Sequence, residues 1–234
     1  MSFSGRIALV TGASRGIGRA ASLALAKAGA HVIAVARSVG GLEELDDDIK
    51  SEGGTATLVP LDLMDYPGID RMAAAVHDRW NRLDALFGNA GILGPLTPIA
   101  HLNPKAWEEV MAVNVTANWR LIRAFDLLLR KSDAGRVLMV SSAVARLNRP
   151  YWGPYAISKA ALEMLTFTYA AECNGTNVKA NALNPGPTRT RMRAAAMPGE
   201  DPMSLPAPEE LAPLILEMLS PACTKTAELV TFRR

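Results

Sequence analysis

Tyr155 and Lys159 lie four residues apart, and Ser142 precedes the tyrosine by thirteen residues. Residues at i and i+4 share one face of a helix, so we expect the lysine ammonium to lie close to the tyrosine phenol. A free phenol ionises near pH ~10, and a neighbouring ammonium favours the phenolate and lowers that pKa. Lowering the pKa to about 7 requires roughly 4 kcal/mol of differential stabilisation. The pair could then exchange a proton with a substrate at neutral pH.

Ser142 comes just after an apolar run, Val137–Val140, and could hydrogen-bond the same substrate oxygen. The three residues together predict a proton-transfer site. Each alone has an ordinary alternative, because serine pairs after strands often form turns, and most tyrosine rings and lysine amines are simply packed or solvated. A candidate nucleotide-binding turn at the start of the chain favours the catalytic interpretation.

A glycine-rich turn follows the first apolar run. Gly12, Gly16 and Gly18 lie between the run Ile7–Thr11 and a helical pattern that begins at Gly16. Glycine permits a tight turn and lets the backbone approach a pyrophosphate, which then lies at the helix N-terminus. The spacing is GxxxGxG rather than GxGxxG, but its strand–loop–helix context predicts a nucleotide site.

The end of the second apolar run indicates which nucleotide binds. NAD sites usually place an acidic residue there, on the adenosine ribose, whereas here Ala36 is followed by Arg37 and Ser38. Arg37, with Arg15 in the glycine-rich turn, could bind a 2′-phosphate. One charge-assisted hydrogen bond contributes roughly 1.5–3 kcal/mol, a preference of about 10- to 100-fold. We therefore predict NADP(H) in preference to NAD(H), with two solvated surface arginines as the alternative.

Short aliphatic runs alternate with longer helical patterns along the chain. The runs are Ile7–Thr11, His31–Ala36, Ala56–Leu61, Ala85–Phe87, Val137–Val140, Val178–Leu183 and Leu229–Phe232. The helical patterns are Gly16–Ala28, Leu42–Glu52, Ile69–Arg82, Pro104–Arg130, Tyr155–Cys173 and Glu209–Leu219. This alternation predicts an α/β fold of the Rossmann type, a doubly wound parallel sheet of about seven strands flanked by helices in three layers. Ligands bind at the carboxyl ends of such strands, where Thr11, Asn89 and Ser142 fall.

The composition is that of one globular domain over residues 1–234, since 49% of the residues are hydrophobic, 21% are charged, and no linker or repeat divides them. The net charge of +2 comes without a basic run, so no nucleic-acid partner is implied. No apolar stretch reaches the ~18 residues of a membrane span, and the start lacks a signal-peptide pattern. Two cysteines are too few for a disulfide framework, which favours the cytoplasm. The three histidines show no metal-ligand spacing, so we predict no metal site.

The helical pattern Tyr155–Cys173 is apolar around most of its circumference. A helix that covers one face of a sheet normally keeps a polar stripe toward solvent. Deep burial within its own chain is one explanation, and contact with a second subunit is the other. We expect a homodimer or homotetramer.

These motifs together resemble the short-chain dehydrogenase/reductase family over nearly the whole chain. The resemblance adds Asp62-Leu63 as an adenine contact, Asn89–Gly91 as the motif after the fourth strand, and Pro185–Thr190 as the loop that contacts the nicotinamide carboxamide. A Thr-Gly pair common before the last strand appears here as Thr226-Ala227. The cofactor contacts predicted in all are Gly12, Ser14, Arg15, Gly16, Ile17, Gly18, Arg37, Ser38, Asp62, Leu63, Asn89, Ala90, Gly91, Tyr155, Lys159, Pro185, Gly186, Thr188 and Thr190.

The resemblance also implies a catalytic tetrad, Asn114, Ser142, Tyr155 and Lys159. Tyr155 would be the general acid in carbonyl reduction and the base in alcohol oxidation, and Ser142 would polarise the substrate oxygen. Lys159 would lower the tyrosine pKa and hold the nicotinamide ribose, and Asn114 would anchor a water that links Lys159 to solvent. The nicotinamide supplies the hydride chemistry.

The substrate, expected to be a small carbonyl or alcohol, is less readable. The segment 188–208 should form a lid, and its Arg189, Arg191 and Arg193, with Arg146 and Arg149, would suit an anionic substrate such as an acyl thioester on a phosphorylated carrier. Solvated or structural arginines explain them equally well. Two other functions stay open: an NADP-binding regulatory protein without catalysis, and an isomerase or dehydratase that uses the nucleotide transiently.

Overall fold

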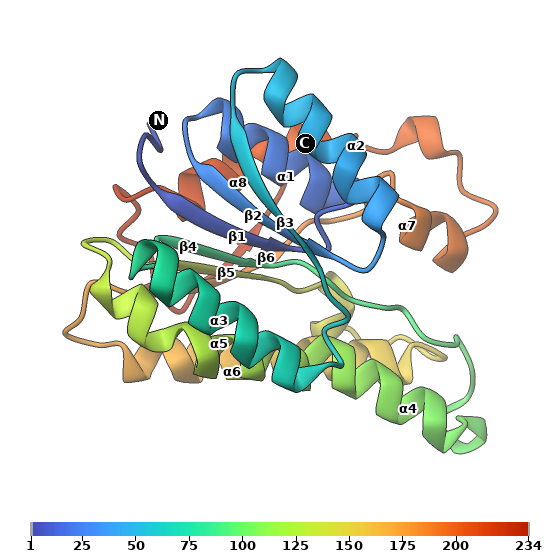
Figure 1. Cartoon of the computed structure of the whole chain (residues 1–234). Helices are drawn as coiled ribbons and strands as arrows, with labels where there is room; N and C mark the ends of the chain where they lie inside the picture. The colour runs from blue at the N-terminus through green and yellow to red at the C-terminus, as the bar shows by residue number, and fades with distance from the viewer. Residues whose placement is uncertain (1, 234) are drawn as a thin grey trace.

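The computed structural model describes residues 2–233, and at its centre lies a parallel sheet of seven strands (Figure 1). The strands are β1 (Ile7–Thr11), β2 (His31–Ala36), β3 (Thr55–Pro60), β4 (Ala85–Gly88), β5 (Arg136–Val140), β6 (Lys179–Asn184) and β7 (Leu229–Thr231). Their order is β3-β2-β1-β4-β5-β6-β7, and every neighbouring pair is parallel. This confirms the predicted doubly wound sheet, whose order reverses between β1 and β4.

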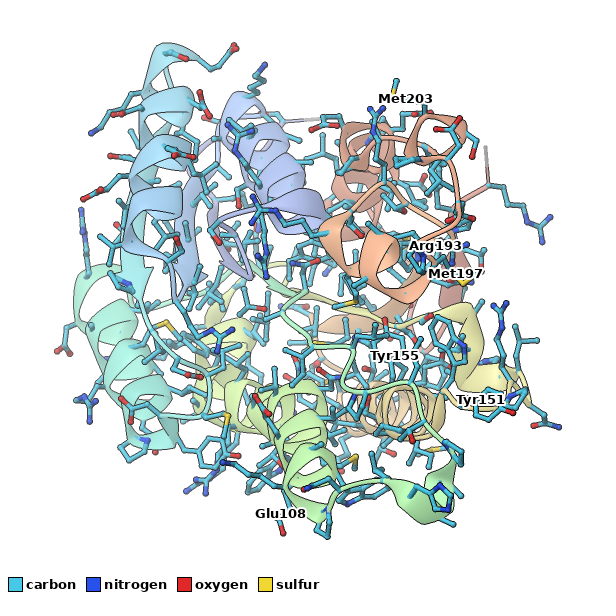
Figure 2. All side chains as sticks on the ribbon, turned by 90° about the vertical axis from the view of Figure 1, so that its right-hand side faces the viewer. Glu108, Tyr151, Tyr155, Arg193, Met197 and Met203 are labelled. Atoms are coloured by element: carbon cyan, nitrogen blue, oxygen red, sulfur yellow. The ribbon has the colours of Figure 1, made fainter. Side chains whose placement is uncertain are left out.

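Helices cover both faces of the sheet and make the outer two of three layers (Figure 1). The helices are α1 (Gly16–Lys27), α2 (Val39–Ser51), α3 (Tyr66–Trp80), α4 (Pro104–Met111), α5 (Ala117–Lys131), α6 (Gly153–Glu172), α7 (Arg191–Ala196) and α8 (Ala212–Leu219). One core cluster lies under α1, α2 and α8, and the other under α3, α5 and α6. Figure 2 views the sheet edge at which the strands end, with α7 above it.

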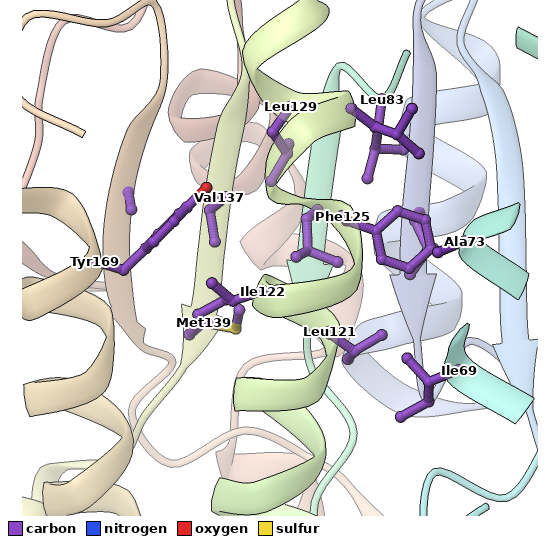
Figure 3. Close-up of a cluster of buried hydrophobic side chains, with 14 of the residues drawn as sticks. Ile69, Ala73, Leu83, Leu121, Ile122, Phe125, Leu129, Val137, Met139 and Tyr169 are labelled. Carbon is purple, nitrogen blue, oxygen red and sulfur yellow. The ribbon is translucent and has the colours of Figure 1, made fainter. Parts of the chain in front are cut away.

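The aliphatic runs form strands because both of their faces are buried. Every residue of β1, β4 and β5 is buried, as expected for central strands of a parallel sheet, whereas the edge strand β3 is only partly covered. Below the sheet, Figure 3 shows Phe125 of α5 beside Ala73 of α3. Within residues 2–233, no helix combines the length and apolarity needed to cross a bilayer.

Two helices begin earlier than the hydrophobic pattern indicated, because short polar side chains cap them. The Ser38 hydroxyl accepts a hydrogen bond from the Gly41 N–H and starts α2 at Val39. Asp65 does the same for the Gly68 N–H and starts α3 at Tyr66. These contacts satisfy N–H groups that the first helical turn leaves unpaired.

Two differences from the sequence-based prediction go beyond the ends of an element. The helix predicted over Pro104–Arg130 is interrupted by a π-helical turn, Ala112–Thr116, between α4 and α5. The segment 188–208, which we predicted as a lid and did not include among the helical patterns, contains α7. Ala227 has φ of 58°, a left-handed conformation that glycine adopts without steric cost, which gives a physical reason for the glycine expected there.

Candidate active site

Hydrogen bonds join the carboxyl ends of β1 and β4 at the point where the strand order reverses. The Thr11 hydroxyl accepts hydrogen bonds from the N–H groups of Asn89 at 3.0 Å and Ala90 at 3.1 Å. The Asn89 side-chain amide donates in turn to the Thr11 carbonyl oxygen at 3.0 Å. Asn89 therefore fixes the glycine-rich turn against the loop after β4, which assigns it a structural part in the crevice where such folds bind ligands.

The glycine-rich turn requires glycine at the predicted positions. Gly12 and Gly16 have φ of 64° and 55°, in the left-handed region. A Cβ added at Gly18 would collide with the Gly12 carbonyl oxygen and the Asn89 amide. No side chain caps the first turn of α1, so its N–H groups can receive an anion brought close by the turn.

Arg37 lies at the end of β2, where an adenosine ribose would be read. Its guanidinium is 3.8 Å from the Asp62 carboxylate, and both side chains are largely exposed. An exposed ion pair of this kind contributes little, so the guanidinium can exchange it for a phosphate. The hydroxyl of Ser38 already caps α2, and the Leu63 side chain is buried in the core beneath the sheet. Leu63 could thus face a nucleotide only through its backbone.

Ser142, Tyr155 and Lys159 meet at the end of β5. Ser142 begins a 3₁₀ turn, Ala143–Arg146, and its hydroxyl bonds to the Tyr155 phenol. Tyr155 and Lys159 share one face of α6 and are 8% and 3% exposed. The Lys159 Nζ donates to the Val140 carbonyl oxygen at 2.7 Å and lies 5.7 Å from the centroid of the Tyr155 ring. The structure thus brings together the three residues predicted to transfer a proton.

Burial raises the pKa of the Tyr155 phenol, and the hydrogen bond with Ser142 lowers it in part. Burial lowers the pKa of Lys159 to about 8. We predicted a lowered tyrosine pKa, and the structure shows the opposite direction. The ammonium is bonded to the Val140 carbonyl and lies over the ring face, so it does not offset the loss of solvent around the phenol. Tyr155 is therefore protonated at neutral pH, the state needed to donate a proton to a carbonyl.

Asn114 lies fully buried in the π-helical turn and connects the loop after β4 to α6. Its Oδ1 accepts from the Ile92 N–H at 2.8 Å, and its Nδ2 donates to the Ile92 carbonyl oxygen and the Ser158 hydroxyl, both at 2.9 Å. A Cβ added at Gly91 would lie 3.2 Å from the Asn114 amide oxygen and 3.4 Å from Lys159 Nζ. Asn114 and Lys159 therefore approach each other across Gly91.

The loop after β6 reaches the glycine-rich turn. The Thr188 hydroxyl donates to the Pro185 carbonyl oxygen at 3.1 Å, and Gly186 has φ of 65°. Thr190 caps α7, and its methyl group would lie 3.5 Å from a Cβ placed at Gly16. The predicted nicotinamide loop and the predicted pyrophosphate loop are thus neighbours.

The site contains two residues that were not predicted from the sequence. Trp152 is buried beside Tyr155, with ring centroids 6.2 Å apart. Glu163 is a buried carboxylate one turn after Lys159, and it accepts hydrogen bonds from the Ser141 hydroxyl at 2.5 Å and the Arg146 guanidinium at 2.8 Å. A carboxylate in the middle of α6, among apolar residues, was a usable signal for Glu163. Nothing in the spacing identified Trp152.

The predicted lid arginines are arranged differently from one another. Arg193 forms two hydrogen bonds with Glu200, both 2.6 Å long, and the Arg189 guanidinium contacts the sulfur of Met203. Arg191 is exposed. Among residues 2–233, no group of three or more histidine, cysteine or acidic side chains is placed to hold a metal ion.

Comparisons with known proteins agree with this geometry. A family model described as short chain dehydrogenase matches residues 6–201. The uncharacterized oxidoreductase YciK of Escherichia coli K12 is 40% identical over 217 residues, which are 92% of this chain and 86% of that protein. A short chain dehydrogenase from Shigella flexneri, crystallised with NADP, is 39% identical with a TM-score of 0.93, and the match covers 97% of both chains. Another from Escherichia coli CFT073, crystallised with NADPH, is 38% identical with a TM-score of 0.91 over 97% of this chain and 96% of that one.

A family match over most of the chain, a shared fold and the grouped motifs point the same way. The chain belongs to the short-chain dehydrogenase/reductase family of Rossmann-fold oxidoreductases.

Proposed function

We propose that this protein is an NADP(H)-dependent oxidoreductase that interconverts a carbonyl and a secondary alcohol, with Tyr155 as general acid and base. The observation that carries the proposal is the meeting of Ser142, Tyr155 and Lys159 beside the glycine-rich turn. The cradle at Gly12, Gly16 and Gly18, which Cβ atoms would obstruct or strain, fits the pyrophosphate of a dinucleotide.

When bound, the nicotinamide supplies or accepts the hydride. The Ser142 hydroxyl and the Tyr155 phenol hydrogen-bond the substrate oxygen, and the phenol gives its proton to that oxygen during reduction. Lys159, with a pKa of about 8, is mostly protonated at pH 7 and stabilises the tyrosinate that remains. Asn114 holds the loop after β4 against α6, and the segment 188–208 serves as the lid of the site.

The test of this function is NADPH oxidation with a panel of ketones, aldehydes and 3-oxoacyl thioesters. Reduction of at least one class, lost in Tyr155→Phe, is expected. NADPH binding without oxidation by any member of the panel would favour the regulatory alternative, and conversion of a hydroxyl compound without net change in the cofactor would favour the isomerase or dehydratase.

Cofactor preference provides a separate prediction. NADPH should bind at least about tenfold more tightly than NADH, because Arg37 and Arg15 can bond the 2′-phosphate and no carboxylate stands at Ala36. The relatives crystallised with NADP and NADPH support this choice. Arg37→Ala should reduce the difference in affinity between NADPH and NADH. Arg79 lies in the last turn of α3, so Arg79→Ala should preserve that difference. Equal dissociation constants in the unmodified protein, measured by titration, would contradict the assignment.

We also propose a homo-oligomer in the cytoplasm. Apolar side chains stand exposed on α5 (Trp119, 43%; Leu127, 73%) and α6 (Ile157, 38%; Met164, 66%), two helices on the same face of the sheet (Figure 1). Light scattering at micromolar concentration should report a dimer or tetramer, and Met164→Glu should weaken it because a carboxylate would be buried. A monomer of about 25 kDa in the unmodified protein would mean that this face needs no partner.

A further inference from the structure

Tyr155 packs in a cluster of apolar side chains from four separate segments. They form what we call the Tyr155 cluster: Leu93, Val144, Trp152, Tyr155, Ala156, Met192, Ala196 and Met197. Leu93 comes from the loop after β4, Val144 from the 3₁₀ turn, Trp152 from the start of α6, and the methionines from α7 and its end. Figure 2 shows Tyr155 below Met197 on this edge of the molecule. We therefore expect a carbonyl that reaches the phenol to lie beside this cluster.

The arginines near the cluster are paired or lie outside it, and the Lys159 ammonium is hydrogen-bonded to the Val140 carbonyl oxygen. Arg146 is paired with the buried Glu163, and Arg193 is held by two hydrogen bonds to Glu200. The guanidinium of Arg149 lies 5.3 Å from the centroid of the Trp152 ring, on an exposed residue. An anionic group placed in the cluster would lose water without gaining Arg146 or Arg193 as a partner, because both are already paired with carboxylates, and this loss is costly.

The cluster is suited to a flat or bulky apolar group. The rings of Trp152 and Tyr155 are tilted, with centroids 6.2 Å apart, and aromatic rings gain from tilted or offset contact with each other. Met192 and Met197 are unbranched and flexible, so they can adapt their shape to a ligand. These three side chains pack in the same cluster as Tyr155 and favour a hydrocarbon neighbour over a charged one.

We propose that the site takes a neutral carbonyl compound with a bulky apolar flank, of which an aromatic aldehyde is the simplest case. This deepens the proposed function and rests on it, since it presumes that Tyr155 protonates a substrate carbonyl. It also disfavours the anionic substrate suggested by the arginines of 188–208, because the structure pairs Arg193 within that segment.

A matched pair of substrates tests the inference with the full-length protein and NADPH. Methyl 4-formylbenzoate and 4-formylbenzoate carry the same ring and aldehyde and differ in charge, and propanal lacks the ring. We expect kcat/KM for the ester to exceed that for the acid and that for propanal by at least about tenfold. Added salt should leave the ester's advantage over propanal unchanged, because both substrates are neutral.

Variants test whether Trp152 causes the preference for the ester over propanal. Trp152→Ala should raise KM for the ester and reduce the ester-to-propanal ratio, and Trp152→Phe should restore most of that ratio. Leu147→Ala is the matched control. Leu147 is exposed at the end of the 3₁₀ turn that carries Val144, and it lies outside the Tyr155 cluster, so the ester-to-propanal ratio should stay unchanged. Unchanged NADPH affinity in each variant shows that the nucleotide site is intact.

Two results would overturn the proposal, and they differ. Equal or better use of the acid, lost in Arg149→Ala, would show that the site reads an anion while carbonyl reduction itself stands. Failure to reduce any of the three aldehydes or the wider panel, with NADPH still bound, would remove the proposed function and this inference together.

Discussion

Tyr155→Phe is expected to lower kcat for carbonyl reduction by about 10²- to 10⁴-fold, the loss typical when a positioned general acid is removed. The substitution deletes one oxygen and keeps the ring that packs in the Tyr155 cluster. Ser142 is assigned to hydrogen-bond the substrate oxygen and Tyr155 to give it a proton, so the variant loses the group to which proton transfer is assigned. Steady-state kinetics on any carbonyl that the unmodified protein reduces measures the loss.

Cofactor affinity separates this loss from a damaged fold. NADPH should bind Tyr155→Phe nearly as well as the unmodified protein, because the glycine-rich turn and Lys159 remain. Near-normal turnover in the variant would end the assignment of Tyr155 as the acid.

Lys159 is expected to make activity and stability respond to pH in opposite directions. Its folded-state pKa of about 8 lies below the ordinary lysine value of 10.5, because burial disfavours the ammonium. As pH rises through about 8, the lysine loses the charge that stabilises the tyrosinate, so the rate of reduction should fall. Between about 8 and 10.5 the unfolded chain binds more protons than the folded one, so the free energy of unfolding contributed by this group should rise.

The matching measurements are kcat against pH and denaturant unfolding over the same range. Lys159→Ala should lose turnover, weaken cofactor binding and flatten the pH dependence of both quantities near 8. Lys159→Met, which keeps most of the side-chain volume without the charge, should be slow but at least as stable as the unmodified protein at pH 7. A kcat that stays level from pH 8 to 10 in the unmodified protein would exclude a catalytic role for the ammonium. A fall in kcat near pH 8 that persists in Lys159→Met would exclude it as well.

Local patterns of apolar residues in the sequence predicted most of the fold. The runs at β1 and β2 have the predicted bounds because a parallel strand buried on both faces is uniformly apolar and needs no distant information. The grouping of Thr11, Asn89 and Ser142 followed from the same rule, since parallel strands bring their carboxyl ends to one edge. The helical spacing of Tyr155 and Lys159 likewise placed both on one face of α6.

Features that depend on contacts between distant segments could not be read in this way. The tyrosine pKa depends on burial under α7 and on where the Lys159 ammonium finds an acceptor, and that acceptor is a carbonyl at the end of β5. The sequence left open whether Arg146 and Arg193 bind a substrate anion or are solvated or structural, and folding pairs them with Glu163 and Glu200. The short helix α7 has too few residues for periodicity to reveal it.

The π-helical turn makes this enzyme sensitive to the number of residues in a helix as well as to their identity. Ala112–Thr116 holds one residue more than a regular turn would, and that extra residue lets Asn114 face Ile92 while α4 and α5 continue on either side. Each residue turns an α-helix by about 100°. Loss of any one residue between α4 and α5 would leave the side chains of both helices unchanged. It would rotate α4 about the helix axis relative to α5. Insertions and deletions here would therefore disturb the loop beside Lys159 more than most single substitutions on the exposed face of the same helix.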